Sequence, residues 1–200
     1  MHITHFFTPM SGFAYLGMGA LCALAQRHGV EVVHRPVHIG KVFAAVEATP
    51  PPLQSAARLK WRRTDMMRWA RHRDLPLREQ PKHWPVNADS AACMIIAAQQ
   101  MGLDGTALAS SLLSAVWARD LDISAPQVLT GLADELGLMG KELMQRTATL
   151  EVQQIYEANT ADAIAAGVIG SPTYLYGEEF FFGQDRLAFL EEALSHHSAA

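Results

Sequence analysis

The sequence predicts an α/β fold in which a helical block separates two strand-bearing ends of the chain. Runs of β-branched and aromatic residues occur at residues 2–7, 30–35 and 173–182, close to the two ends. Residues 55–167 instead carry apolar residues at helical spacing, with Gly and Pro between the runs. The chain has 200 residues and half of them are hydrophobic, which suits one core domain with a large insertion.

The first end of the chain predicts a strand–helix–strand unit. Residues 2–7 are expected to form a short strand. Ser11 is a suitable N-cap for a buried helix over residues 13–27, and Gly29 is a suitable stop. Residues 30–35 then form the second strand. A helix that connects two strands of one sheet is typical of parallel pairing, so we expect the two strands to be parallel and the crossover to be right-handed.

The middle of the chain predicts helices joined by breaks that contain proline. Residues 37–48 are ambiguous, and the sequence Thr-Pro-Pro-Pro at residues 49–52 forms a stiff, extended break. Residues 75–87 form a loop with several prolines. Helices are expected at residues 55–73, 89–100, 105–117, 126–136 and 141–167.

The last part of the chain predicts a hairpin followed by a helix. Strands at residues 173–176 and 179–182 are joined by a turn at Gly177, and Asp185 is the expected N-cap of a helix that ends near Ser195. This order of elements is typical of a thioredoxin-like fold with an all-helical insertion. We therefore expect a thioredoxin-like domain at residues 1–36 and 168–200 and a helical insertion domain at residues 37–167.

Two short segments indicate a thiol site. Ser11 lies between a strand and a helix, and Ser171-Pro172 precedes another strand. Thioredoxin-like folds place a thiol between such a helix N-terminus and such a proline, because free N–H groups and the helix dipole stabilise a thiolate. The positions of a Cys-x-x-Cys motif read Ser-Gly-Phe-Ala at residues 11–14, so the thiol must come from another molecule, and glutathione is the expected cofactor. Each segment also has an ordinary structural explanation, as an N-cap and as a strand start.

Glutathione is an extended peptide with charged groups at its γ-glutamyl end. A cis peptide bond before Pro172 would leave the N–H and C=O groups of Ser171 free to pair with that peptide. Asp185 can meet the ammonium group, while backbone N–H groups at the helix start beside Gln184 can meet the carboxylate. Asp185 keeps the alternative role of a simple N-cap.

Charge and composition argue against several other classes of protein. The net charge of −4 argues against nucleic-acid binding. The apolar run at residues 13–25 is too short to cross a membrane and lacks the features of a signal peptide, so we expect a cytoplasmic protein. Cys22 and Cys93 have no paired or metal-binding spacing; we expect both in the core, and no metal site. The basic residues 58–73 form either a solvated helix face or a place where one cation meets a ligand carboxylate.

Four segments resemble one known family. They are Ser-Gly-Phe-Ala-Tyr-Leu at residues 11–16, Asp-Met-Met-Arg-Trp-Ala at residues 65–70, Trp-Pro-Val-Asn at residues 84–87, and residues 170–187, which begin Gly-Ser-Pro-Thr and end Phe-Gly-Gln-Asp-Arg-Leu. With these segments the chain is similar, over nearly its whole length, to the 2-hydroxychromene-2-carboxylate isomerases. These are bacterial relatives of the kappa-class glutathione transferases within the DsbA-like group. The residues that depart from the family pattern are Gly12, Ala14, Ala48 and Arg58.

The resemblance implies a thioredoxin-like fold, glutathione as the cofactor and a homodimer. By matched position, Ser11 would be the catalytic residue and would hold the glutathione sulfur. The residues that would bind the rest of glutathione are Ser171, Pro172, Phe182, Gly183, Gln184 and Asp185. The residues that would line the pocket for a small aromatic carboxylate, or for another electrophilic substrate, are Val42, Phe43 and Trp84.

The resulting hypothesis is a glutathione-dependent isomerase of the 2-hydroxychromene-2-carboxylate type. Addition of the glutathione thiolate to a conjugated carbon would remove a double bond, the resulting single bond would rotate, and elimination would regenerate glutathione. The reaction needs no redox change, which suits a site without a cysteine pair. Two alternatives remain at this stage: a kappa-like glutathione transferase that consumes the cofactor, and a non-catalytic thiol-binding or scaffold protein on the same fold.

Overall fold

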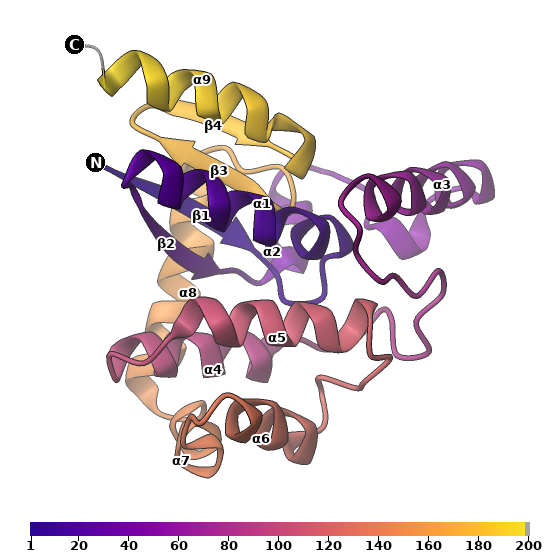
Figure 1. Ribbon diagram of the computed structural model, residues 1–200. Coiled ribbons are helices and arrows are strands. Elements are labelled where there is room, and N and C mark those ends of the chain that lie inside the picture. The colour runs from indigo at the N-terminus through magenta and orange to yellow at the C-terminus, as the bar shows by residue number, and fades with distance from the viewer. Residues whose placement is uncertain (199–200) are drawn as a thin grey trace.

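A mixed sheet forms the centre of the computed structural model, which describes residues 1–198 (Figure 1). Within those residues the sheet has four strands in the order β2-β1-β3-β4. Strand β1 (His2–Phe7) pairs in parallel with β2 (Glu31–Pro36) and antiparallel with β3 (Thr173–Tyr176). Strand β4 (Glu179–Phe182) closes the hairpin with β3. The two ends of the chain thus share one sheet, as the sequence predicts.

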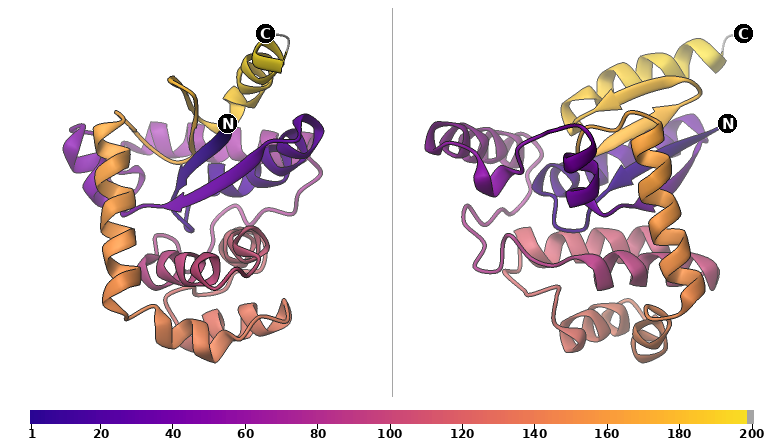
Figure 2. Two further views of the ribbon diagram at one scale, coloured as in Figure 1. Left: turned by 90° about the vertical axis from the view of Figure 1, so that its left-hand side faces the viewer. Right: turned by 180° about the vertical axis from the view of Figure 1, so that it is seen from behind.

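Helices cover both faces of this sheet. Helices α1 (Gly12–His28) and α9 (Leu187–Ser198) pack on the face to which Ile3 points, in a cluster with Leu21 and Leu190. Helices α2 (Ile39–Ala45) and α8 (Leu150–Ala165) cover the other face, where Phe6 packs with buried residues of both helices. Figure 2 shows α8 crossing the molecule on the side of the sheet away from α1.

The helical block packs against the sheet domain through α1. It contains α3 (Ala56–His72), α4 (Asp89–Gln100), α5 (Gly105–Trp117), α6 (Pro126–Glu135) and α7 (Gly140–Arg146). Figure 1 shows α4 and α5 as a layer beneath α1, with α6 and α7 in a further layer. The largest hydrophobic cluster joins Leu16 of α1 to Ile95 of α4 and Leu112 of α5, so the core runs across the expected domain boundary. That boundary itself stays a prediction.

Local capping decides where several helices begin. The hydroxyl oxygens of Ser11 and Ser55 accept hydrogen bonds from backbone N–H groups of α1 and α3, and Asp104 does the same for α5. The prediction of a single helix at residues 141–167 was wrong, because two helices lie there. The chain instead turns between α7 and α8, where Thr149 accepts a hydrogen bond from the N–H of Val152 and starts a new helix.

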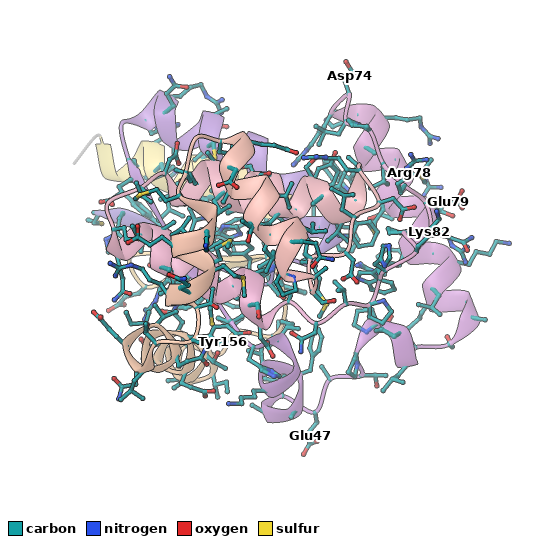
Figure 3. All side chains as sticks on the ribbon, turned by 90° about the horizontal axis from the view of Figure 1, so that it is seen from below. Glu47, Asp74, Arg78, Glu79, Lys82 and Tyr156 are labelled. Atoms are coloured by element: carbon teal, nitrogen blue, oxygen red, sulfur yellow. The ribbon has the colours of Figure 1, made fainter. Side chains whose placement is uncertain are left out.

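The ambiguous segment at residues 37–48 contains α2, and a short 3-10 turn, η1 (Pro51–Leu53), follows it. Glu47 and Asp74, which follow α2 and α3, have positive φ angles and project outward from the molecule (Figure 3). Of the described helices, none combines the length and apolar character needed to cross a membrane.

Candidate functional site

Ser11 caps the first helix and lies opposite the loop that precedes β3. Its backbone is extended, with φ −79° and ψ 119°, and its hydroxyl oxygen accepts a hydrogen bond from the N–H of Ala14 at 3.2 Å. The same hydroxyl donates to the backbone carbonyl of Ser171 at 3.0 Å. The side chain is buried, but it borders a cavity. Segments 160 residues apart in the sequence therefore meet through one hydroxyl group.

The peptide bond between Ser171 and Pro172 is cis. The hydroxyl of Ser171 accepts a hydrogen bond from the N–H of Thr8 at 3.1 Å, which ties this loop to the end of β1. The sequence-based hypothesis requires a free carbonyl at Ser171. In the structure this carbonyl instead accepts a hydrogen bond from the Ser11 hydroxyl. Its N–H has no hydrogen-bond partner among residues 1–198, so it is the backbone group there that can donate to an extended ligand.

The turn after β4 forms the next wall of the site. Gly183 has a φ of 102°, and its N–H donates to the carbonyl of Pro172 at 2.9 Å. A side chain at Gly183 would also collide with the carboxylate of Asp185, so this turn needs glycine. Asp185 is not the helix N-cap that the sequence predicts: it lies inside the 3-10 turn η2 (Gln184–Arg186), where no side chain caps the backbone. The carboxylate is thereby left for other partners.

One cavity of about 730 Å³ joins these segments. It brings together most of the residues that the sequence singles out. These are Ser11, Ser171, Phe182, Gly183, Gln184 and Asp185 from the expected cofactor site, and Phe43 and Trp84 from the expected substrate site.

Val42 and Pro172 lie outside the cavity lining. Consecutive residues of a helix point in directions about 100° apart, so Phe43 can face the cavity while Val42 faces the core. Val42 is fully buried and packs with Phe6 beneath the sheet. Pro172 is also buried, and it contributes its carbonyl to the turn at Gly183. Both residues therefore position the site without facing a ligand.

Asp65 on α3 is a site residue that the sequence analysis did not select. It lines the cavity together with Asp185. Partial burial, and then the negative charge of Asp185, raise the pKa of Asp65, while Arg68 opposes the shift. The two carboxylates therefore lie within one cavity lining, and Asp185 also lies 3.6 Å from the guanidinium of Arg186. Only the Asp-x-x-Arg-Trp-Ala segment of the resemblance could have indicated Asp65.

Arg62 lies three residues before Asp65. The sequence analysis included it in the basic segment at residues 58–73 but did not select it as a site residue. Its guanidinium carbon lies 4.8 Å from the centre of the Phe13 ring and 5.5 Å from the centre of the Trp84 ring. Burial lowers its pKa to about 10. The basic segment at residues 58–73 was the available signal, but the sequence alone does not show which of its cations faces the cavity.

Tyr156 and Asp89 also line the cavity. The hydroxyl of Tyr156 donates to the Asp89 carboxylate at 2.9 Å, and burial is the main reason that the pKa of Tyr156 is raised. Figure 3 shows Tyr156 within the body of the molecule, whereas Glu47 projects from its edge. This pair adds a phenol and a carboxylate to the polar part of the lining.

Neither cysteine belongs to the site. Cys93 is buried in the core and Cys22 is half-buried; neither forms a disulfide. Burial raises the pKa of both thiols, that of Cys93 to about 11, so both are protonated at neutral pH. Among the described residues, no group of three or more His, Cys, Asp or Glu side chains is arranged to bind a metal ion.

Comparisons with known proteins match this chain over nearly its whole length. A family model described as a DSBA-like thioredoxin domain matches residues 2–195. A 2-hydroxychromene-2-carboxylate isomerase from Sphingobium xenophagum is 27% identical over 96% of this chain and 97% of its own. A protein of the same name from Pseudomonas putida is 26% identical over 97% of this chain and 94% of its own.

A solved structure of a 2-hydroxychromene-2-carboxylate isomerase superposes on the chain with a TM-score of 0.84. It is 25% identical and covers 99% of this chain and 96% of its own. The cytosolic disulfide reductase DsbM from Pseudomonas aeruginosa superposes with a TM-score of 0.70 at 17% identity, over 98% of this chain and 99% of its own. The second likeness concerns the fold alone.

Proposed function

The chain belongs to the DSBA-like thioredoxin domain family, and from this premise we propose that it is a glutathione-dependent isomerase of the 2-hydroxychromene-2-carboxylate type. The observation that carries the proposal is the hydroxyl of Ser11 at the N-terminus of α1, bordering a cavity of about 730 Å³ where a family Cys-x-x-Cys motif would lie. The isomerase names of the relatives from Sphingobium xenophagum and Pseudomonas putida support the reaction class.

The helix start fits the thiol group of glutathione. The N–H groups of the first helical turn have no partner within the helix, and the positive end of the helix dipole lies there. Both favour a thiolate over a thiol. The Ser11 hydroxyl can rotate from the Ser171 carbonyl toward a sulfur atom and donate its hydrogen bond there. Ser11 then stabilises the thiolate and is not itself attacked.

The other end of the cavity fits the γ-glutamyl group. Asp65 and Asp185 both line the cavity and provide two carboxylates for an ammonium group. The unpartnered N–H of Ser171 suits a backbone carbonyl of the same peptide. Charged and peptide groups of glutathione thus have matching groups within one cavity.

When bound, glutathione would supply a nucleophilic thiolate for reversible addition to a conjugated carbon of the substrate. The residues of this chain orient the two partners. Ser11 and the first turn of α1 hold the sulfur anionic, and Asp65 and Asp185 fix the γ-glutamyl end. Phe43, Trp84 and the prolines of residues 50–52 provide an apolar wall that excludes water from the reacting carbon.

The first experiment is calorimetric titration of glutathione into the wild type, Ser11→Ala and Asp185→Asn. We expect Asp185→Asn to weaken binding about 10-fold, because one charge-assisted hydrogen bond is lost. Ser11→Ala should retain the cofactor but raise the pKa of its bound thiol and lower turnover by about 100-fold. Wild-type protein that does not bind glutathione would contradict the proposal.

A product analysis then separates the isomerase from its two alternatives. Incubation with 2-hydroxychromene-2-carboxylate and glutathione should convert the acid to its ring-opened isomer with no loss of free thiol. A stoichiometric loss of thiol would instead indicate a transferase. Glutathione binding without any conversion would indicate a thiol-binding scaffold.

A further inference from the structure

Three arginines of the described chain line the cavity, and their surroundings differ. Arg186 lies 3.6 Å from the Asp185 carboxylate, so it already has an anionic partner. Arg58 is exposed, and water screens its charge. Arg62 is partly buried, and no carboxylate of residues 1–198 forms an ion pair with it. Among the described residues, Arg62 is therefore the arginine of this lining that combines partial burial with the absence of an ion-paired carboxylate.

Two aromatic rings hold the Arg62 guanidinium in place. Its Cζ atom lies 4.8 Å from the centre of the Phe13 ring and 5.5 Å from the centre of the Trp84 ring. Such contacts stabilise the charge through the ring faces. They do not satisfy the N–H donors of the guanidinium. Phe13 follows Ser11 by two residues, so this clamp borders the part of the cavity where the thiolate is proposed to lie.

A guanidinium in this situation favours an anionic ligand. Burial lowers the pKa of Arg62 to about 10, because water is removed and no protein anion replaces it. Arg62 still carries its charge at neutral pH. Its parallel N–H donors match the two oxygens of a carboxylate, and a flat aromatic acid can extend from them between apolar walls.

We propose that Arg62 binds the carboxylate of the aromatic acid substrate and that the rings of Phe13 and Trp84 hold its guanidinium ready for that contact. This inference deepens the proposed isomerase function and takes the identity of the substrate from it. Arg62 and Asp65 are three residues apart and lie on one face of α3. One helix face thus offers a cation to the substrate acid and a carboxylate to the cofactor ammonium.

The kinetic test compares Arg62→Met, Arg62→Lys and Arg63→Met with the wild type, using 2-hydroxychromene-2-carboxylate in the presence of glutathione. Met retains much of the apolar stem between the two rings. We expect Arg62→Met to raise KM by about 10- to 100-fold, with a smaller rise for Arg62→Lys, which lacks the planar fork. Arg63→Met removes the same charge from the same helix but lies outside the cavity lining, and it should keep the wild-type KM. Equal effects of Arg62→Met and Arg63→Met would overturn the proposal.

The binding test separates the substrate carboxylate from the carboxylates of glutathione. Calorimetry with trans-2-hydroxycinnamate and with its neutral amide should show a preference for the acid in the wild type that Arg62→Met removes. The Kd of glutathione should change less than about 2-fold in the same variant. Weaker glutathione binding with an unchanged acid preference would assign Arg62 to the cofactor and overturn the inference. If the wild type prefers the acid over the amide, if Arg62→Met loses this preference, and if the wild type converts no substrate, the carboxylate site would be supported and the isomerase function refuted.

Discussion

The Ser11 hydroxyl serves both the fold and the proposed chemistry. It accepts from Ala14 as an N-cap and donates to Ser171 across the site. A hydroxyl has one hydrogen to donate, so donation to a bound thiolate requires it to leave the Ser171 carbonyl. The N-cap contact uses an oxygen lone pair and survives that rotation. A serine can therefore switch its donor between two acceptors without releasing the start of the helix.

Gly12 leaves room for two side chains that pack against the start of α1. A Cβ atom there would collide with the methyl group of Met66 and would lie 2.9 Å from the ring of Trp117. Both side chains come from the helical block. The space beside the backbone of Gly12 is therefore already filled by these two side chains.

We predict that Gly12→Ala lowers the free energy of unfolding by about 1–3 kcal/mol through overpacking. Gly19→Ala is the matched control in the same helix, because nothing lies within 4 Å of a Cβ atom there. That variant should raise stability by about 0.5–1 kcal/mol through its helix propensity. Chemical denaturation of both variants measures the difference. Equal stabilisation by the two substitutions would contradict the packing argument.

At the scale of elements, Arg73 joins three segments that build the site. It follows α3, and its guanidinium donates to the carbonyl of Leu16 in α1 and, at 3.3 Å, to the carbonyl of Gln184 in η2. The ring of Trp69 lies 5.0 Å away. The turn that presents Asp185 is therefore fastened to the helix that presents Ser11.

We predict that Arg73→Met costs about 1.5–3 kcal/mol of stability, because two backbone carbonyls lose a charged donor. It should also weaken glutathione binding, since η2 becomes less fixed. Arg71→Met is the control, because Arg71 is exposed in the same last turn of α3. Thermal unfolding with and without glutathione gives both quantities. If Arg71→Met loses as much stability as Arg73→Met, the effect would come from the lost charge at the end of α3 and not from the two carbonyl contacts.

The sequence determined the elements of this fold better than the contacts of its site. Apolar periodicity and the two β-rich ends predicted the sheet, and Ser11 was recognisable as a helix N-cap. The break before α8 was missed because Thr149 reads as an ordinary helix residue until its capping role is seen. Arg62 and Asp65 were not selected, because a basic amphipathic helix does not show which side faces a cavity. Val42 and Phe43 were both selected by the family resemblance, and the ambiguous segment gave no helix phase that could separate the buried Val42 from Phe43 in the cavity lining.

At the scale of the whole molecule, two histidines lie at the centre of the sheet. His5 of β1 and His34 of β2 are register partners, and their Nδ1 atoms are 3.0 Å apart. Both side chains are buried, and neither Nε2 atom has a partner among the described residues. His5 also stacks between Phe7 and Tyr174, at ring distances of 4.5 and 5.1 Å. The pair therefore folds in the neutral state, with one Nδ1–H donating to the other ring.

This pair predicts a molecule that loses stability in mild acid. Burial, and then the charge of His34, lower the pKa of His5; burial lowers the pKa of His34 to about 4 although Asp104 opposes it. The unfolded chain binds protons near the ordinary histidine pKa of about 6.5, whereas the folded chain does not, so stability is complete above that pH and falls below it. Each histidine should contribute a slope of about 1.4 kcal/mol per pH unit as the pH falls from about 6.5 to 5.

Urea denaturation between pH 7.5 and 5 measures this slope above the range in which carboxylates titrate. His5→Phe should roughly halve the slope, because one titrating group is gone and the new ring can still stack on Phe7 and Tyr174. Its stability at pH 7.5 should nevertheless be lower, because the Nδ1 atom of His34 loses its partner. His2→Gln is the control at an exposed site on the same strand and should keep the wild-type slope. An unchanged slope in His5→Phe would place the acid sensitivity elsewhere in the molecule.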